Sequence, residues 1–203
     1  MTSLTLLDWR RQVGRLYADV RAASTPAQGH ALWRAGRDRL FATHPDSPLE
    51  PAQREGFRGL PVEPYDPALR FEVELDTAVD GGEPRRWEVA TDGDGVVPFS
   101  RLGVAHLPGL GDLDVWWLES YGGGVFVPVR DRADDTYGGG RYLLDTVKGA
   151  DLGGDAPGGR LVLDLNFAYN PSCAYSPAWT CPLAPAGNTL AVALPGGERT
   201  TSG

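Results

Sequence analysis

The sequence predicts a mainly β (α+β) fold: an antiparallel β-barrel or sandwich-like body with two N-terminal helices. The 203 residues include 27 glycines and 17 prolines, which is typical of short strands joined by tight turns rather than of a helical bundle. The hydrophobic spacing changes from helical at the start of the chain to alternating after residue 68. Because no helical pattern separates the later strands, a parallel βαβ fold is disfavoured.

Residues 1–42 are expected to form a helical pair that packs on the body. Thr5 and Asp8 fit a capping box at the start of the first helix. Thr25 can cap the second helix, with Pro26 at its first position. The apolar residues at helical spacing are Trp9, Val13, Leu16, Tyr17 and Val20 in the first helix, and Leu32, Trp33, Leu40 and Phe41 in the second.

A proline-rich connector is predicted over residues 43–68. Proline lacks an N–H and fixes its own φ, so this segment is expected to be extended. Phe57, Leu60 and Tyr65 are apolar enough to dock it onto the body. The connector separates the helical pair from an antiparallel β-domain over residues 69–198.

The β-domain begins with a clean alternation of apolar and charged residues from Phe71 to Leu75, which predicts a half-buried strand. Asp92–Gly95 is a strong turn signal. The strand candidates are Phe71–Leu75, Trp87–Val89, Val96–Phe99, Gly103–Leu107, Leu113–Glu119, Val125–Arg130, Arg141–Thr146, Leu161–Asn166 and Thr189–Leu194.

Two glycine runs form a short internal echo, each preceded by tyrosine: Gly122–Gly124 after Tyr121, and Gly138–Gly140 after Tyr137. Glycine allows positive φ and close approach of another group. That group is either a ligand or a neighbouring strand, and we favour the neighbouring strand. A phosphate-binding loop is disfavoured, because neither run leads into a helix.

The overall charge argues against nucleic-acid binding. The chain has 27 acidic and 19 basic residues and a formal net charge of -8, whereas a phosphate backbone requires a positive surface. No stretch approaches the roughly 20 apolar residues of a membrane helix, so no membrane partner is expected. Met1–Leu7 has no signal-peptide pattern, and we therefore expect a cytoplasmic protein.

The densest group of polar residues lies at positions 164–188, after a strand that begins at Leu161. Because side chains alternate along a strand, Asp164 and Asn166 are expected on the same face. A carboxylate beside an amide can orient a ligand, bind a hard cation or relay a proton. Four prolines stiffen the following loop, which alternatively serves only to complete the core.

The two cysteines, Cys173 and Cys181, match no zinc, haem or thioredoxin motif, and no histidine lies near them in the sequence. No metal site is therefore predicted. Three states remain open: reduced and buried thiols, a loop-closing disulfide, or a reactive thiol. A reactive thiol needs a cation nearby, and Arg141 on a neighbouring strand is the candidate.

Three peptide strings carry a family resemblance: residues 137–152, 163–175 and 180–185, with Phe57–Leu60 and Tyr65–Pro67 upstream. They resemble the bacterial and archaeal domain-of-unknown-function family 1684 over most of residues 50–198. The resemblance implies no established activity. It implies that the signature positions are Tyr137, Arg141, Asp164, Asn166, Tyr169, Asn170, Cys173 and Cys181.

These observations lead to the hypothesis that a small anionic ligand binds in a polar pocket. Arg141 would clamp the anionic group, and Asp164 would act as a base or cation ligand. Whether the protein is an enzyme stays open; if it is one, hydrolysis or a related group transfer is expected. The residues expected to bind the ligand are Tyr137, Arg141, Asn166, Tyr169 and Asn170.

The alternative is a non-catalytic structural or protein-interaction module, in which the signature loop is a fold-specifying plug and Arg141–Asp164 is a buried ion pair. An open polar cavity beside Asp164 would favour the ligand, and a loop packed shut would favour the plug. A flavin-binding barrel is a third possibility by fold analogy, although no motif requires a cofactor. The sequence does not indicate an oligomeric state.

Overall fold

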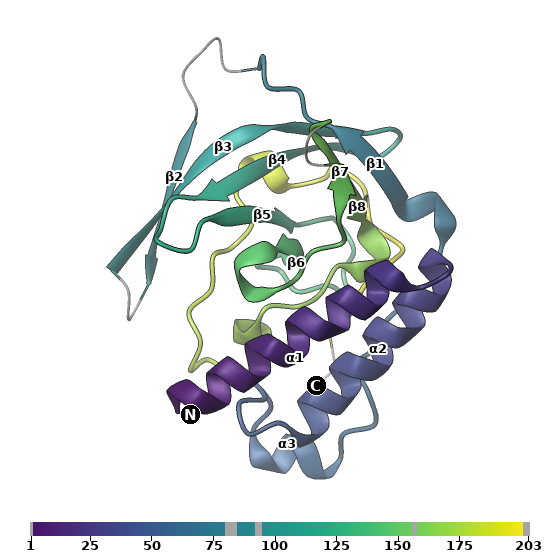
Figure 1. Ribbon diagram of the computed structural model, residues 1–203, viewed down its shortest axis with the longest axis vertical. Coiled ribbons are helices and arrows are strands. Elements are labelled where there is room, and N and C mark those ends of the chain that lie inside the picture. The colour runs from purple at the N-terminus through teal and green to yellow at the C-terminus, as the bar shows by residue number, and fades with distance from the viewer. Residues whose placement is uncertain (1, 80–84, 92–94, 156–157, 201–203) are drawn as a thin grey trace.

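The computed structural model describes residues 2–79, 85–91, 95–155 and 158–200, and it shows two antiparallel sheets packed beside a pair of long helices (Figure 1). The five-stranded sheet is a meander of β2 (Arg86–Thr91), β3 (Gly95–Leu107), β4 (Gly111–Leu118), β5 (Gly124–Val129) and β6 (Arg141–Asp145). The three-stranded sheet has the order β1 (Arg70–Glu74), β8 (Arg160–Asp164) and β7 (Gly154–Asp155). The predicted mainly β body with N-terminal helices is confirmed.

The sheets do not close into a barrel within the described part of the chain, so the barrel alternative is wrong. The outer strand β6 meets the irregular segment after β8 at a single bridge between Tyr142 and Tyr169. On the other side, and among the residues that the structure describes, the chain after β1 pairs with β3 at the isolated bridge between Asp76 and Val104. Isolated bridges replace the continuous ladders that a closed barrel needs.

The two predicted helices are α1 (Ser3–Ala22) and α2 (Pro26–Thr43), and the connector adds the short α3 (Pro51–Glu55). Thr25 caps α2 with Pro26 in its first turn, as predicted. The capping box of α1 is formed by Thr2 and Thr5, three residues before the predicted pair of Thr5 and Asp8. The hydroxyl of Thr2 accepts from the Thr5 N–H, and the Thr5 side chain accepts in return from the Thr2 N–H.

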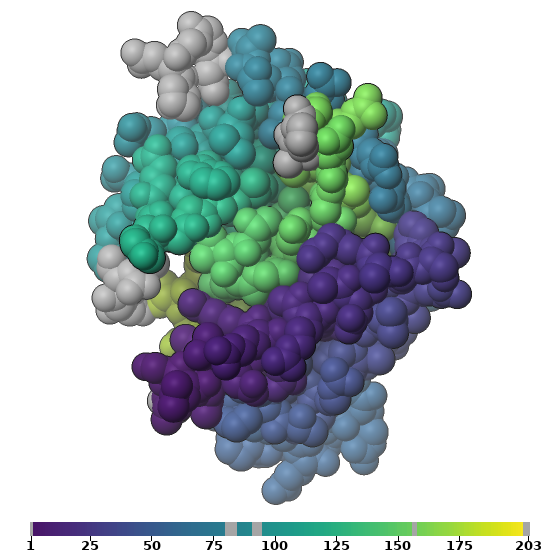
Figure 2. All heavy atoms as spheres, in the orientation of Figure 1, coloured from purple at the N-terminus to yellow at the C-terminus, as the bar shows by residue number. Residues whose placement is uncertain are grey.

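The helices belong to the same core as the sheets. Trp33 of α2 is fully buried, donates its indole N–H to the Tyr17 hydroxyl at 3.0 Å, and packs on the Phe167 ring. Figure 2 shows α1 lying against the green surface of the segment that carries β6 to β8. No helix in the described ranges has the length and apolar character needed to span a bilayer.

The strand predictions hold except near the C-terminus. The segments predicted at 96–99 and 103–107 form the single strand β3, which carries a bulge between Arg101 and Gly103. Residues 189–194 are not a strand: the 3-10 helix η5 (Ala186–Asn188) precedes an irregular segment. The Asn188 amide fixes this segment by donating to Pro128 O at 2.9 Å and Asp114 O at 2.8 Å. Most of the predicted turn at 92–95 lies outside the described residues.

Both glycine runs lie against other parts of the same chain, which favours a structural role over contact with a ligand, although the neighbours are an irregular segment and the 3-10 helix η2 (Thr146–Lys148). Gly140 has φ +91°, and a Cβ there would lie 2.7 Å from the Ala184 Cβ. Gly124 has φ +152°, and a Cβ there would lie 2.6 Å from a methyl group of Val147. Glycine is required at both positions by conformation and by space.

Candidate functional site

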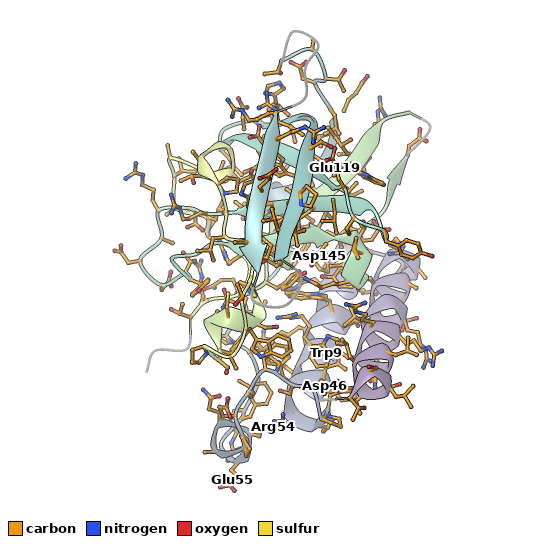
Figure 3. All side chains as sticks on the ribbon, turned by 90° about the vertical axis from the view of Figure 1, so that its left-hand side faces the viewer. Trp9, Asp46, Arg54, Glu55, Glu119 and Asp145 are labelled. Carbon is orange, nitrogen blue, oxygen red and sulfur yellow. The ribbon has the colours of Figure 1, made fainter. Side chains whose placement is uncertain are left out.

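Two cavities lie where the helices meet the β-body. The hairpin cleft, of about 350 Å³, is lined by the α1–α2 turn and the three-stranded sheet, including Arg21, Thr25, Arg70 and Asp164. The inner cavity, of about 110 Å³, is lined by Trp9, Val13, Tyr17, Arg37, Phe41, Tyr142, Asp145, Lys148, Ala150, Tyr169, Asn170, Pro171, Ser172 and Cys181. In Figure 3 the labelled side chains of Trp9 and Asp145 lie where the helices meet the sheet.

Asp164 and Asn166 are adjacent, as predicted, but Asn166 lies in the 3-10 helix η3 (Leu165–Phe167) rather than in a strand. Asp164 Oδ1 accepts from the Asn166 backbone N–H at 3.1 Å and from its side-chain N–H at 2.7 Å. The Asn166 amide also binds both backbone groups of Asp66, each at 2.8 Å. The acid–amide pair therefore fixes the end of the connector to the β-body.

The Asp164 carboxyl lies at the end of β8 and contributes to the wall of the hairpin cleft. Burial raises its pKa, and hydrogen bonds from Asn166 oppose that shift. The Tyr65 hydroxyl donates to Asp164 Oδ2 at 3.3 Å, and burial raises the pKa of Tyr65 to about 12. Tyr65 is therefore a neutral donor at physiological pH.

Arg141 is fully buried and binds groups of its own chain. Its Nη2 lies 2.7 Å from Asp131 Oδ2, and the Asp131 side chain is only 1% exposed. Its Nη1 donates to the carbonyls of Gly196 at 2.7 Å and Glu198 at 3.1 Å. Arg141 thus connects the start of β6 to the C-terminal segment, and it lines neither cavity.

Arg37 of α2 forms one wall of the inner cavity and is surrounded by aromatic rings. Its guanidinium carbon lies 5.2 Å from the Trp33 ring, 5.0 Å from the Phe41 ring and 4.8 Å from the Tyr169 ring. Cation–π contacts of this kind stabilise a desolvated guanidinium. Among the described residues, the buried Arg37 Nε has no hydrogen-bond partner.

Glu198 neutralises the charge of Arg37. Its carboxylate accepts from Arg37 Nη2 at 2.7 Å, from the Asn170 N–H at 3.1 Å and from the Tyr175 hydroxyl. Glu198 is fully buried, and burial raises its pKa while Arg37 opposes the shift. The pair fixes Arg37 against the cavity wall.

Asn170, like Arg37, is a residue of the inner-cavity lining with a buried polar atom that has no partner among the described residues. The residue is 4% exposed, and its Nδ2 donates to the Arg199 carbonyl at 2.9 Å. Within the described ranges, Asn170 Oδ1 has no hydrogen-bond partner. Leaving a buried amide oxygen unpaired costs about 1–3 kcal/mol, so a bound group that donates a hydrogen bond to this oxygen would be stabilised.

Lys148 and Asp145 lie together at the other side of the inner cavity. Their Nζ and Oδ2 atoms are 3.0 Å apart, and the Lys148 side chain is 56% exposed, which places its ammonium at the cavity mouth. The charge of Asp145 raises the pKa of Lys148. The cation is therefore present at physiological pH.

Tyr137 and the two cysteines form a group at the edge of this cavity. The Tyr137 hydroxyl donates to Cys173 Sγ at 3.6 Å. The Cys173 thiol also hydrogen bonds with Cys181, which lines the cavity. Both cysteines are free and partly exposed, and no cluster of three metal-ligating side chains occurs in the part of the chain that the structure describes.

The structure thus distributes the predicted site residues over three places. Asp164 and Asn166 lie beside the hairpin cleft, whereas Arg141 lies in a separate buried ion pair. Tyr169, Asn170 and Cys181 line the inner cavity, with Tyr137 and Cys173 beside it.

Sequence analysis missed four polar residues of the inner cavity and its support: Arg37, Asp145, Lys148 and Glu198. A signal for Arg37 was present, because Trp33, Arg37 and Phe41 share one helical face. Lys148 is the single lysine of the chain, but nothing in the local pattern places it at a cavity.

The comparisons with known proteins identify a family but no activity. The family model described as "Protein of unknown function (DUF1684)" matches residues 55–199. The solution NMR structure of the uncharacterized protein from gene locus rrnAC0354 of Haloarcula marismortui is similar to this chain, with 33% identity and a TM-score of 0.55. The match covers 82% of this chain and 90% of that one. No curated protein matches. The chain therefore belongs to the DUF1684 family of proteins of unknown function.

Proposed function

We propose that the protein binds a small anionic molecule with at least one hydrogen-bond donor in the inner cavity. The observation that carries this proposal is the buried Asn170 Oδ1, which has no partner among the described residues. A ligand hydroxyl or amino group would satisfy this acceptor. The rigid support behind it, from Arg199 and Glu198, holds the amide in place to receive such a donor.

The exposed Lys148 ammonium is the charged group of the cavity lining that supports an anion. Its lining contains two cations, Arg37 and Lys148, and one acid, Asp145. Glu198 neutralises Arg37, and Asp145 lies 3.0 Å from the Lys148 ammonium, which remains exposed and can donate to a second acceptor. Charge-assisted hydrogen bonds from such donors are the stronger kind.

The size and walls of the cavity limit the ligand. A volume of about 110 Å³ limits the ligand to a small molecule. Trp9, Tyr17 and Phe41 supply apolar walls on the helix side. A short hydroxy acid has this combination of size, charge and donor.

The proposal is tested by measuring the binding of lactate and glycerate by NMR titration, with acetate as an acid that lacks the donor. We expect the donor-bearing acids to bind more tightly than acetate. Native mass spectrometry of freshly purified protein supplies an independent readout, because a retained ligand adds a discrete mass.

Lys148→Gln is the informative variant, because it removes the cation at the mouth without emptying the core. We expect it to weaken binding about tenfold, the value of one charge-assisted hydrogen bond. Arg160→Gln, an exposed change on β8, is the matched control and should leave affinity unchanged. Equal affinity for acetate and the donor-bearing acids, or an unaffected Lys148→Gln, would contradict the proposal.

A structural role is favoured for the other part of the signature. Arg141, Asp164 and Asn166 all have intramolecular partners that tie distant segments together. These contacts support the alternative in which the signature residues specify the fold. The buried ion pair of Arg141 is with Asp131, however, and not with Asp164 as predicted. The two roles are compatible, because they concern different places in the molecule.

A further inference from the structure

The two cysteines face one another across a short, braced loop. Cys173 lies in the 3-10 helix η4 (Ser172–Ala174), and its thiol hydrogen bonds with that of Cys181. The far end of the loop is fixed by the Tyr142 hydroxyl, which donates to the Pro182 carbonyl at 2.7 Å. The two thiols are therefore neighbours, and both cysteines are free and partly exposed.

The surroundings of the two sulfur atoms differ. Cys173 Sγ receives hydrogen bonds from the Cys181 thiol and from the Tyr137 hydroxyl at 3.6 Å. These donors lower the pKa of Cys173 to about 6, whereas the same contact and burial raise the pKa of Cys181. The pKa of Tyr137 is raised to about 12, so its hydroxyl stays a donor. At neutral pH the pair therefore holds one thiolate and one thiol.

We propose that Cys173 and Cys181 form a redox-active dithiol that reacts with low-molecular-weight disulfides, with Cys173 as the attacking sulfur and Cys181 as the resolving one. This inference is independent of the ligand proposed for the inner cavity. It rests on the proximity of the two thiols, their partial exposure and the Tyr137 hydroxyl, which donates to Cys173 Sγ at 3.6 Å.

The reaction proceeds in two exchanges. The Cys173 thiolate attacks one sulfur of the small disulfide, a mixed disulfide forms, and one small thiolate leaves. That thiolate or water takes the proton of Cys181. The Cys181 thiolate then attacks Cys173 Sγ and expels the second small thiolate. The two protein sulfurs are oxidised by two electrons in total, and the small disulfide is reduced to two thiols.

The test uses the full chain, reduced and then exposed to oxidised glutathione near neutral pH. Intact mass spectrometry should show the loss of two hydrogens, and peptide mapping should find the Cys173–Cys181 bridge. Cys181→Ser should stop at one glutathionyl group on Cys173. Cys173→Ser should react with oxidised glutathione at least about tenfold more slowly than Cys181→Ser, because the remaining thiol is largely protonated.

A pH profile separates this role from a merely structural one, and it needs no cysteine variant. Alkylation of Cys173 by iodoacetamide in the reduced wild-type protein should have its midpoint near pH 6. Tyr137→Phe should move the midpoint upward, whereas Tyr121→Phe, at a fully exposed position, should not move it.

Three results would overturn the proposal. One is a wild-type alkylation midpoint at the ordinary thiol value of about 8.5. Another is the absence of the internal bridge after treatment with oxidised glutathione. The third is an equal reaction rate for the two single-cysteine variants.

Discussion

Arg141 shows how a single buried charge is paired inside this protein, with its Nε left without a hydrogen-bond partner among the described residues. Its guanidinium meets Asp131 at 2.7 Å and two carbonyls of the C-terminal segment. Removing one member of such a pair leaves the other charged and desolvated, which costs about 3–5 kcal/mol. Arg141 was predicted to bind an external anion, but in the structure it connects β6 to Asp131 and to the C-terminal segment.

We expect Arg141→Met to lower the free energy of unfolding by about 3–5 kcal/mol in urea denaturation. The double variant Arg141→Met with Asp131→Leu should recover part of that loss, because no charge is stranded. Arg70→Met removes the more exposed pair with Glu72 and should change stability by about 1 kcal/mol or less. A small effect of Arg141→Met would refute the structural role.

Asp164 makes a pH-dependent contribution whose sign follows from its raised pKa. The folded protein holds this proton more tightly than the unfolded chain, so the stabilisation is complete below the ordinary value of 3.8. It is lost as the pH rises through the higher folded-state value. The stability of the wild type relative to Asp164→Asn should therefore decrease with pH above 3.8. If denaturant titrations show that the wild type gains stability relative to Asp164→Asn as the pH rises, the pKa of Asp164 is lowered on folding and not raised.

At the scale of elements, the sequence was informative wherever a regular pattern determined the structure. Helical spacing located α1 and α2, and alternation located most of the strands. The strand prediction at 189–194 is wrong because this segment meets the chain after β5 through an isolated parallel bridge between Arg130 and Thr189, not an extended ladder, and the buried Asn188 amide adds hydrogen bonds to two distant carbonyls. A side chain that hydrogen bonds to two distant carbonyls produces no periodic pattern in the sequence from which it could be predicted.

The turn before β6 supplies a prediction at this scale. Gly140→Ala should destabilise the protein by about 2 kcal/mol or more, because φ +91° is strained for alanine and its Cβ would meet Ala184. Gly138→Ala in the same run meets open space and should change stability by about 0.5 kcal/mol or less. Equal effects in thermal denaturation would mean that the turn tolerates a side chain at either position.

At the scale of the whole molecule, one hydrophobic core includes residues of both long helices and both sheets. Which polar side chains meet across this core could not be predicted, because their contacts join segments far apart in the sequence. Arg37 and Glu198 are 161 positions apart. Sequence analysis found Tyr169 and Asn170 through the family resemblance, but it could not supply the α2 side of the cavity.

The shared core predicts that the helical pair and the β-body unfold together. Fluorescence, which reports on buried Trp33 and Trp116, and far-ultraviolet circular dichroism should give coincident denaturation curves. Earlier loss of the helical signal would instead indicate that residues 1–42 form a separate unit.

The central claim, that the inner cavity binds a small anion with a hydrogen-bond donor, is tested most directly by a high-resolution crystal structure of the protein soaked with glycerate. The account predicts glycerate density with a donor within hydrogen-bond distance of Asn170 Oδ1 and the carboxylate near Lys148. A cavity that holds ordered water alone under these conditions, or side chains packed shut across it, would contradict the claim.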